Sequence, residues 1–311
     1  MSATRRRALV TGGAGFIGSH LVERLLSEGI GVVVLDNLST GKRQNVPPEA
    51  EFLPGDVRDT DIVAKAVKDV DTVVHLAAKV SIRASVAEFY EDAQVNLVGT
   101  LNVLKACASL HIEKFVYASS MAVYADASQP HPLPETYATE PVSPYGVSKL
   151  ACEKYARLVA QQSGFQAVTL RYFNTYGPRQ TYTPYVGVIT IFVQRLLRGQ
   201  APIIYGDGEQ CRDLVYVGDI VDCTYRAMVR DVGSDVFNVG SGVGMSVNRI
   251  AELLCARLRP GANPVHAAEQ PGELRNSVAD IHKAQRLLGY EPKGRIEDRL
   301  EEIIAWNQGL V

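Results

Sequence analysis

The chain has 311 residues, of which 46% are hydrophobic and 21% charged, and its formal net charge is −2. This balance is typical of a globular protein with one large or two moderate domains, and the lack of a net basic charge argues against nucleic acid and membrane surfaces as partners. No run of about 18 apolar residues and no signal peptide is visible, and the five cysteines and six histidines are scattered. We therefore expect a cytoplasmic protein without disulfides and without a metal site.

The first half of the chain alternates short apolar runs with helical patterns. The apolar runs predict strands at 7–12, 31–36, 51–56, 71–78, 114–120 and 166–173, and the stretches between them predict helices at 16–28, 60–68, 85–109 and 145–162. Strand–helix alternation predicts a parallel sheet with helices on both faces, and ligands bind such sheets at the carboxyl ends of the strands.

After about residue 177 the pattern changes to a loop rich in Pro, Gly and Tyr. Beyond it we predict short strands near 203–205 and 214–217 and helices at 187–198, 218–230, 246–258, 280–288 and 296–307. The predicted fold is thus α/β: a Rossmann-type, doubly wound parallel sheet over residues 1–177 and a smaller mixed α/β substrate-binding lobe over 178–311. Part of 210–240 is expected to return to the first domain. A cleft between two lobes is a natural place for a substrate.

A glycine-rich segment, VTGGAGFIGSH, follows the first predicted strand and opens a helix. Gly12, Gly15 and Gly18 have the spacing G-x-x-G-x-x-G, which lets the backbone approach a pyrophosphate at the N-terminus of the helix. Asp36 ends the second predicted strand, where a carboxylate accepts hydrogen bonds from ribose hydroxyls and repels a 2′-phosphate. Asp56 follows the third strand and suits the adenine edge. These residues predict a nicotinamide dinucleotide and favour NAD over NADP.

Residues 143–150, SPYGVSKL, place a tyrosine and a lysine four residues apart just inside a predicted helix. Ser143 is a good N-cap, and the side chains of Tyr145 and Lys149 lie one above the other. A nearby cation, the positive end of the helix and an oxidised nicotinamide would each lower the pKa of the phenol, so that Tyr145 can act as a general base. Ser120, at the end of the fifth predicted strand, can relay a proton. Together they indicate alcohol–ketone redox chemistry; the alternatives are a surface helix that carries Tyr and Lys by chance and a serine that caps a strand.

Motifs over almost the whole chain resemble the extended short-chain dehydrogenase/reductase superfamily, among them TGGAGFIGSHL, HLAA, SSMAVY, YGVSK, RYFNTYGPRQ and FNVGSG. Within it the sequence is most similar to the UDP-galactose 4-epimerase branch and to the related UDP-N-acetylglucosamine 4-epimerases. The resemblance implies NAD as cofactor, a UDP-sugar as substrate, and a homodimer that pairs through the helices matching 85–107 and 145–162. It implies catalysis by Ser120, Tyr145 and Lys149. The residues implied for the cofactor are Gly12, Gly15, Phe16, Ile17, Gly18, Asp36, Asn37, Ser39, Thr40, Gly41, Asp56, Val57, Leu76, Ala77, Ala78, Asn96, Tyr145, Lys149 and Tyr172. Those implied for the nucleotide sugar are Ser120, Asn174, Val188, Ile189, Tyr205, Arg212, Arg275 and Ser277.

The residues that follow Ser120 favour one reaction of this superfamily. By the resemblance, sugar 4,6-dehydratases carry an acidic pair there, related decarboxylases a glutamate and epimerase-reductases a cysteine, whereas this chain has Met121 and Ala122. We therefore expect 4-epimerisation of UDP-glucose/UDP-galactose or of the N-acetylated forms: Tyr145 would take the O4 proton, C4 would give hydride to NAD, and the 4-keto sugar would swing and take hydride back on its other face. The alternatives are a nucleotide-sugar dehydrogenase or reductase, an epimerase of UDP-glucuronate or another nucleotide sugar, and a non-enzymatic NAD sensor.

Two positions depart from the epimerase pattern. Gln270 stands where an arginine is expected to hold the diphosphate, and Arg275 is the nearest substitute. Ser277 stands where strict glucose/galactose epimerases carry a tyrosine that narrows the sugar pocket. This second departure predicts a pocket that admits N-acetylated sugars.

Overall fold

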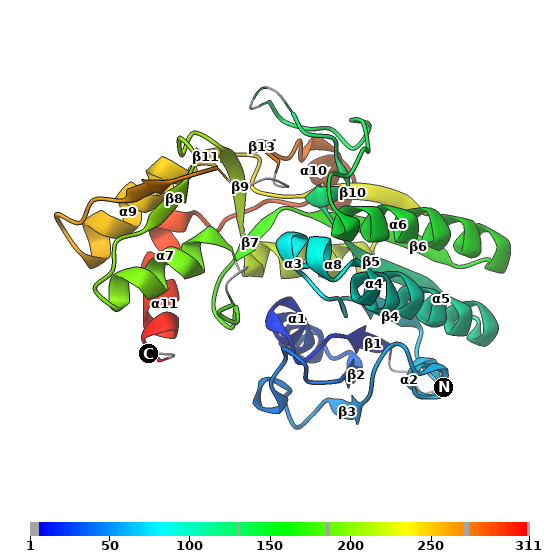
Figure 1. The fold of residues 1–311 in the computed structure, drawn as a ribbon. Coiled ribbons are helices and arrows are strands. Elements are labelled where there is room, and N and C mark those ends of the chain that lie inside the picture. Colours follow the sequence, from blue (N-terminus) through cyan, green and yellow to red (C-terminus); the bar gives the residue numbers. More distant parts are fainter. Residues whose placement is uncertain (1–5, 128, 130, 184–186, 270–273, 310–311) are drawn as a thin grey trace.

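The structure is a computed structural model that describes residues 6–127, 129, 131–183, 187–269 and 274–309. Its centre is a seven-stranded parallel sheet with the order β10-β6-β5-β4-β1-β2-β3 (Figure 1). The strands are β1 Arg7–Thr11, β2 Gly31–Asp36, β3 Glu51–Pro54, β4 Thr72–His75, β5 Lys114–Ser120, β6 Gln166–Tyr172 and β10 Asp235–Val239. The order reverses between β1 and β4, so a crevice for a ligand is expected at their carboxyl ends. The predicted doubly wound α/β fold is confirmed.

Helices cover both faces of this sheet, which explains why its strands are almost continuously apolar. On one face lie α1 Phe16–Ser27 and α8 Val217–Val229, whose buried side chains pack with Val10 and Val34 of the sheet. On the other face lie α2 Thr60–Val67, α5 Gly99–Leu110 and α6 Pro144–Ser163, packed on Leu9 and Phe115. The hydrophobic cores on the two faces of the sheet therefore hold in place the strand ends that carry the predicted site.

The second half of the chain builds a smaller unit, seen to the left in Figure 1. A small sheet has the order β11-β9-β13, with β7 also paired to β9, and β8 pairs with β12. Its strands are β7 Asn174–Tyr176, β8 Ile203–Tyr205, β9 Cys211–Tyr216, β11 Gly244–Ser246, β12 Val265–Ala267 and β13 Asn276–Ser277; its helices are α7 Val188–Leu197, α9 Val247–Leu258 and α11 Ile296–Gln308, while α10 His282–Leu288 contacts β10. The domain boundary at 177/178 stays a prediction, although α8 and β10 lie with the large sheet.

The helix predicted over 85–109 is not continuous. The structure has α3 Ile82–Ala87, α4 Phe89–Asp92, a π-helical segment Ala93–Val98 and then α5. The segment begins early because the Ser81 hydroxyl accepts a hydrogen bond from the Ala84 amide (3.0 Å), and it breaks at Glu88, whose φ of −122° is not helical. Where the π-helical segment meets α5, the Thr100 hydroxyl donates to the carbonyl of Asn96 (2.6 Å). Such π-helical turns frequently lie at functional sites.

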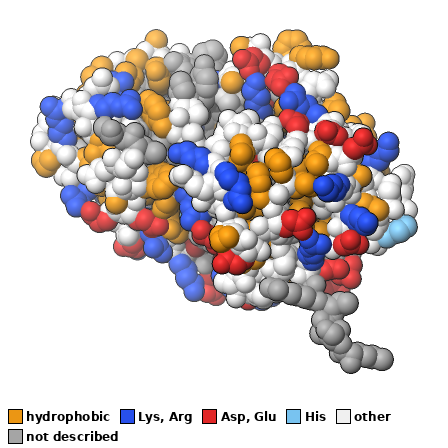
Figure 2. All heavy atoms as spheres, turned by 90° about the horizontal axis from the view of Figure 1, so that it is seen from below, with side chains coloured by type: hydrophobic (Ala, Val, Ile, Leu, Met, Phe, Trp, Pro, Cys, Tyr) orange, Lys and Arg blue, Asp and Glu red, His pale blue; other side chains and the backbone are white. Residues whose placement is uncertain are grey.

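Charges of both signs are mixed on the face shown in Figure 2, with hydrophobic side chains between them. This distribution matches the small net charge and shows no extended surface of one sign on that face. Of the helices within the described ranges, none is long and apolar enough to cross a membrane.

Candidate active site

The glycine-rich loop between β1 and α1 is as tight as its sequence predicts. Gly12 has φ +73°, and the amide of Gly15 donates to its carbonyl (3.1 Å). A Cβ on Gly18 would lie 2.1 Å from the Gly12 carbonyl oxygen, and one on Gly12 would lie 2.8 Å from the Ala77 amide. The N-cap, Gly15, supplies no side-chain acceptor to the first turn of α1, which begins at Phe16 and Ile17. The loop therefore fits a dinucleotide pyrophosphate, which would accept from these amides.

Asp36 ends β2 beside this loop and is 8% exposed. Its carboxylate accepts from the amide of Ala14 (2.9 Å) and from the amide of Leu38 (2.8 Å). Close by, a Cβ on Gly41 would lie 2.8 Å from the carbonyl carbon of Ala14, so the 37–41 turn, which includes Ser39 and Thr40, is pressed against the glycine-rich loop. Asp36 thus anchors the loop through one lone pair of each oxygen and retains others for ribose hydroxyls.

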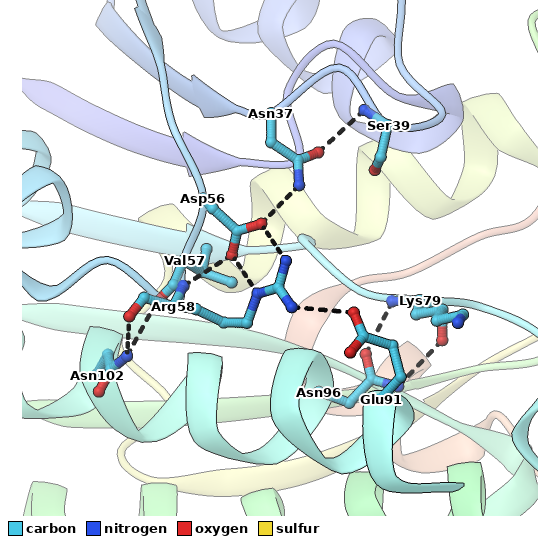
Figure 3. A network of polar contacts seen from close by, with 9 residues as sticks. All are labelled: Asn37, Ser39, Asp56, Val57, Arg58, Lys79, Glu91, Asn96 and Asn102. Atoms are coloured by element: carbon cyan, nitrogen blue, oxygen red, sulfur yellow. Dashed lines mark hydrogen bonds and ion pairs between the residues drawn. The ribbon is translucent and has the colours of Figure 1, made fainter. Parts of the chain in front are cut away.

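Asp56 lies at the centre of the polar network in Figure 3. Arg58 donates to both of its carboxylate oxygens (2.9 Å each), and Asn37 donates to one of them (2.8 Å). The Arg58 hydrogen bonds lower the pKa of Asp56 to about 2, so the carboxylate stays ionised. Arg58 also donates to Glu91 of α4 (2.9 Å). The neighbouring Val57 side chain packs directly against Gly99, where it leaves no room for a Cβ. Sequence analysis missed Arg58, although its place two residues after Asp56 was a usable signal.

Asn96 holds the loop after β4 that carries Leu76, Ala77 and Ala78. Its amide oxygen accepts from the Lys79 amide (2.8 Å), and its Nδ2 donates to the Lys79 carbonyl (3.0 Å) and to Asp92 (2.8 Å). Both N–H groups of the Asn96 side chain are therefore used within the protein, as Figure 3 also shows for Lys79. Asn96 positions this loop at the end of β4.

Ser120, Tyr145 and Lys149 come together at the end of β5. Ser143 caps α6 by accepting from the Gly146 amide (3.2 Å), which brings Tyr145 to the first turn. The Lys149 ammonium donates to the carbonyl of Ala118 (2.8 Å) and lies 5.7 Å from the centre of the Tyr145 ring. The Ser120 side chain lies close enough to the Tyr145 phenol to lower its pKa. The Ser120 hydroxyl, the Tyr145 phenol and the Lys149 ammonium thus form one cluster.

The prediction that neighbouring groups of the chain lower the pKa of the Tyr145 phenol is wrong. Burial raises that pKa above its ordinary value, and the neighbouring Ser120 side chain opposes the rise only in part. Lys149 does not offset this rise, and burial lowers its own pKa to about 8. In the protein without NAD, desolvation therefore raises the pKa of Tyr145 by more than the helix N-terminus and the Lys149 ammonium can lower it.

A buried ion pair behind this cluster was not predicted. Glu153 accepts from Arg171 through both oxygens (2.9 and 2.7 Å) and from the hydroxyl of Ser119. It therefore ties α6 to the ends of β5 and β6. The signal was available, since Glu153 is four residues after Lys149 on the same helix face, whereas the apolar Val147 of this helix is exposed.

The residues expected to bind the sugar fall in separate places. Asn174 donates to Ser277 (3.2 Å), which is fully buried on β13 beside Arg212 of β9. Arg212 donates to the Arg275 carbonyl (3.1 Å), but the Arg275 side chain is exposed and paired with Asp207 (2.6 Å).

The other residues expected at the ligands lie on different elements. Val188 and Ile189 begin α7, and Tyr205 ends β8 under the guanidinium of Arg83 (5.4 Å). The Tyr172 hydroxyl is bonded to Thr224 (2.7 Å). Gln270 lies outside the described residues.

Known proteins resemble this chain over almost its whole length. The NAD dependent epimerase/dehydratase family matches residues 8–240. A UDP-glucose 4-epimerase from Thermotoga maritima, solved with UDP-glucose, is 38% identical with a TM-score of 0.93 and covers 98% of this chain and 99% of its own. A UDP-glucose 4-epimerase from Thermus thermophilus in complex with NAD is also 38% identical, with a TM-score of 0.91 and coverage of 98% and 100%. A UDP-N-acetylglucosamine 4-epimerase from Methanobrevibacter ruminantium, in complex with UDP-N-acetylmuramic acid, is 36% identical with a TM-score of 0.93 and coverage of 99% and 100%.

These similarities extend over both halves of the chain and are too high to reflect the fold alone. They confirm the predicted resemblance to the extended short-chain dehydrogenase/reductase superfamily and confirm NAD as the cofactor. The glycine-rich loop and Asp36 fit that cofactor by their geometry. The chain therefore belongs to the NAD-dependent epimerase/dehydratase family.

Proposed function

We propose that the protein is an NAD-dependent 4-epimerase of UDP-hexoses, acting on UDP-glucose/UDP-galactose and on their N-acetylated forms. One observation carries the proposal: Ser120, Tyr145 and Lys149 cluster at the end of β5, and the next residues, Met121 and Ala122, have no acid or thiol. These groups can move a proton at a sugar hydroxyl, and neither Met121 nor Ala122 can supply the acid that loss of water needs. The related structures of 4-epimerases of UDP-glucose and UDP-N-acetylglucosamine support this reading.

In this proposal the cofactor is held by the glycine-rich loop, by Asp36 and Asp56, and by the loop that Asn96 positions. Bound NAD+ supplies the hydride acceptor and a positive charge. The chain supplies the proton transfer: Tyr145 takes the O4 proton directly or through the Ser120 hydroxyl, which lies beside it. Because burial raises the pKa of the phenol, Tyr145 acts as a base only when a positive charge lies beside it. Lys149, with its pKa at about 8, is mostly protonated at neutral pH, but its charge alone does not offset the burial, so the charge of bound NAD+ would be needed as well.

The nucleotide sugar is proposed to bind between the two halves of the protein. Arg212 offers a planar guanidinium that matches diphosphate oxygens. Asn174 and Ser277 form a hydrogen-bonded pair beside it, which would face the sugar or its diphosphate. We propose Tyr205, Val188 and Ile189 for the base and ribose. Arg275 would serve the diphosphate only after leaving Asp207, with which it is paired.

We also propose a homodimer. The α3–α4 segment and α6 carry apolar side chains that are each more than half exposed: Val86, Phe89, Tyr90, Val147 and Leu158. An apolar stripe of this kind on neighbouring helices is typical of a subunit interface. Sedimentation of the wild type and of Tyr90→Glu tests this, since the substitution should yield a monomer; a monomeric wild type would contradict it.

We propose the cytoplasm as the compartment. All five cysteines are free in the structure, and four of them are buried. Free buried thiols suit a reducing environment. Cell fractionation would test this, and a protein found outside the cytoplasm would contradict it.

The reaction class is tested by the absorbance of the nicotinamide band after a UDP-sugar is added to the purified holoenzyme. A 4-epimerase gives transient internal reduction and releases no NADH. Steady accumulation of NADH would identify a dehydrogenase, and no response to any UDP-sugar would favour an NAD-sensing protein.

A further inference from the structure

The first turn of α6 carries Tyr145, and one backbone donor of this turn is not satisfied by the helix itself. Ser143 serves two of the first amides: its hydroxyl accepts from Gly146 (3.2 Å), and its carbonyl accepts from Val147 (3.0 Å). Pro144 has no N–H group. The amide of Tyr145 therefore remains, because the first four N–H groups of an α-helix have no acceptor within their own helix.

That amide donates to a side chain of a different element, the hydroxyl of Ser85 in α3 (3.2 Å). Ser85 is 2% exposed and Tyr145 is 5% exposed, so bulk water has little access to this bond. The Ser85 hydroxyl donates in turn to the carbonyl of Ile82 (2.6 Å), which fixes its rotation and leaves its lone pairs for the Tyr145 amide. Ser85 is thus a cap that α3, 60 residues earlier in the sequence, supplies to α6 (Figure 1).

α3 is itself fastened to the loop after β4, which is proposed to hold the cofactor. The Ser81 hydroxyl caps the first turn of α3 (3.0 Å). Lys79, in the loop before α3, forms an ion pair with Glu88 at the other end of this helix. The Ser85 hydroxyl is therefore presented by a short helix that is held at both ends, so it can serve as a fixed point for the first turn of α6.

A second contact of the same turn of α6 sets its distance from Ser120. The turn Met121–Val123 follows Ser120 at the end of β5, and the Ser120 hydroxyl accepts from the amide of Ala122 (3.2 Å). A Cβ on Gly146 would lie 2.2 Å from the carbonyl oxygen of Ala122, so α6 and this turn are in direct contact. The first turn of α6 therefore contacts both α3 and the turn after β5, and these two contacts fix Tyr145 relative to Ser120.

We propose that Ser85 is a positioning residue for the reaction: it holds the backbone of Tyr145 so that the phenol stays within reach of Ser120 and of the sugar O4 proton. This inference rests on the proposed 4-epimerase function and deepens it. Ser85 does not act on the substrate itself, because its hydroxyl is buried and its proton is already donated to Ile82. Without this hydroxyl the Tyr145 amide would be a buried donor without its acceptor, and the first turn of α6 would shift. A displacement of about 1 Å at a reacting group can lower a rate by about 10²-fold.

The experiment compares Ser85→Ala with Ser246→Ala in the full-length holoenzyme. Ser246 caps α9 by accepting from the amide of Arg249 at the same distance (3.2 Å), and α9 carries no residue of the proposed site, so this variant controls for the loss of an amide–hydroxyl bond. At a temperature well below both melting points, we expect Ser85→Ala to lower kcat by about 10- to 100-fold, with KM and the amount of bound NAD little changed. Ser246→Ala should turn over as the wild type does.

A second readout does not depend on turnover. Tyrosine labelled with carbon-13 at Cζ reports on the phenol of Tyr145, whose NMR signal is identified by its absence in Tyr145→Phe. In the NAD-bound protein without substrate, we expect this signal to shift or broaden in Ser85→Ala and to stay unchanged in Ser246→Ala. The proposal is overturned by a wild-type Tyr145 signal or a normal kcat in Ser85→Ala, by a change confined to KM, or by an equal loss of kcat in both variants. If the wild type epimerises no UDP-sugar, the proposed function fails, while the NMR comparison still decides whether Ser85 positions Tyr145.

Discussion

The buried ion pair between Glu153 and Arg171 allows a prediction of stability with a definite magnitude. The two side chains are 4% and 5% exposed. In a Glu153→Ala variant, the Arg171 guanidinium keeps only the carbonyl of Glu135 (3.0 Å) and the ring of Tyr124 (4.7 Å). Removing one partner of a buried pair leaves an uncompensated charge, which costs about 3–5 kcal/mol, so we expect the free energy of unfolding to fall by that amount.

Urea denaturation followed by circular dichroism measures this loss as a lower midpoint with an unchanged slope. Glu153→Gln is the matched control, because its amide oxygen still accepts from Arg171; we expect a loss of about 1–3 kcal/mol. The double variant Glu153→Met/Arg171→Met removes both charges and should be more stable than Glu153→Ala. A loss below about 1 kcal/mol for Glu153→Ala, or additive losses in the double variant, would refute the reasoning.

Three further predictions concern the site, and a fourth concerns the effect of the buried His75 on stability. Tyr145→Phe should lower turnover by about 10²–10⁴-fold with NAD binding intact, because it removes the proton acceptor but not the ring; near-normal turnover would exclude Tyr145 from the mechanism. Asp36→Ala should weaken NAD binding and relax discrimination against NADP in a titration, and a wild type that binds both equally would contradict the assignment. Ser277→Tyr should bring a ring into the proposed sugar pocket, where a clash with the N-acetyl group would cost about 1–3 kcal/mol. This clash should lower the rate on UDP-N-acetylglucosamine by about 5- to 150-fold while UDP-glucose is spared; equal loss on both sugars, or a variant that is simply less stable, would argue against a gate. Burial lowers the pKa of His75 to about 3 from its ordinary 6.5, so the unfolded chain binds the extra proton first as the pH falls. The free energy of unfolding should thus decrease between pH 6.5 and 3, by at most about 1.4 kcal/mol per pH unit for this group, and His75→Gln should reduce the slope; an unchanged slope would contradict the assignment.

The parts of the fold that the sequence predicts well are those with long apolar signals. Strands β1, β2, β5 and β6 are buried on both faces and therefore read as continuous apolar runs. The short strands β7, β11, β12 and β13 have two or three residues each, which is too few for a period to be visible. The broken helix over 85–109 could not be foreseen either, because no glycine or proline marks the non-helical Glu88 or the π-helical segment Ala93–Val98.

In the candidate site, too, some features can be predicted from local sequence patterns and others cannot. The glycine spacing and the Tyr145–Lys149 pair are local patterns, and local patterns predict which residues meet. The direction of the Tyr145 pKa depends on burial, which is set by tertiary packing and cannot be read from spacing. Arg58 and Glu153 have local signals, but their partners Glu91 and Arg171 are 33 and 18 residues away in the sequence, so the contacts themselves could not be predicted.

Proton NMR of a UDP-sugar panel tests the central claim most directly. The holoenzyme is incubated, without added NAD, with UDP-glucose, UDP-galactose, their N-acetylated forms and UDP-glucuronate in separate samples. The account predicts that UDP-glucose and UDP-galactose each convert to the same mixture of the two C4 epimers, that the N-acetylated pair does likewise, and that no keto sugar accumulates. A product altered at any position other than C4, a stable 4-keto sugar, or no conversion of any hexose in the panel would contradict it.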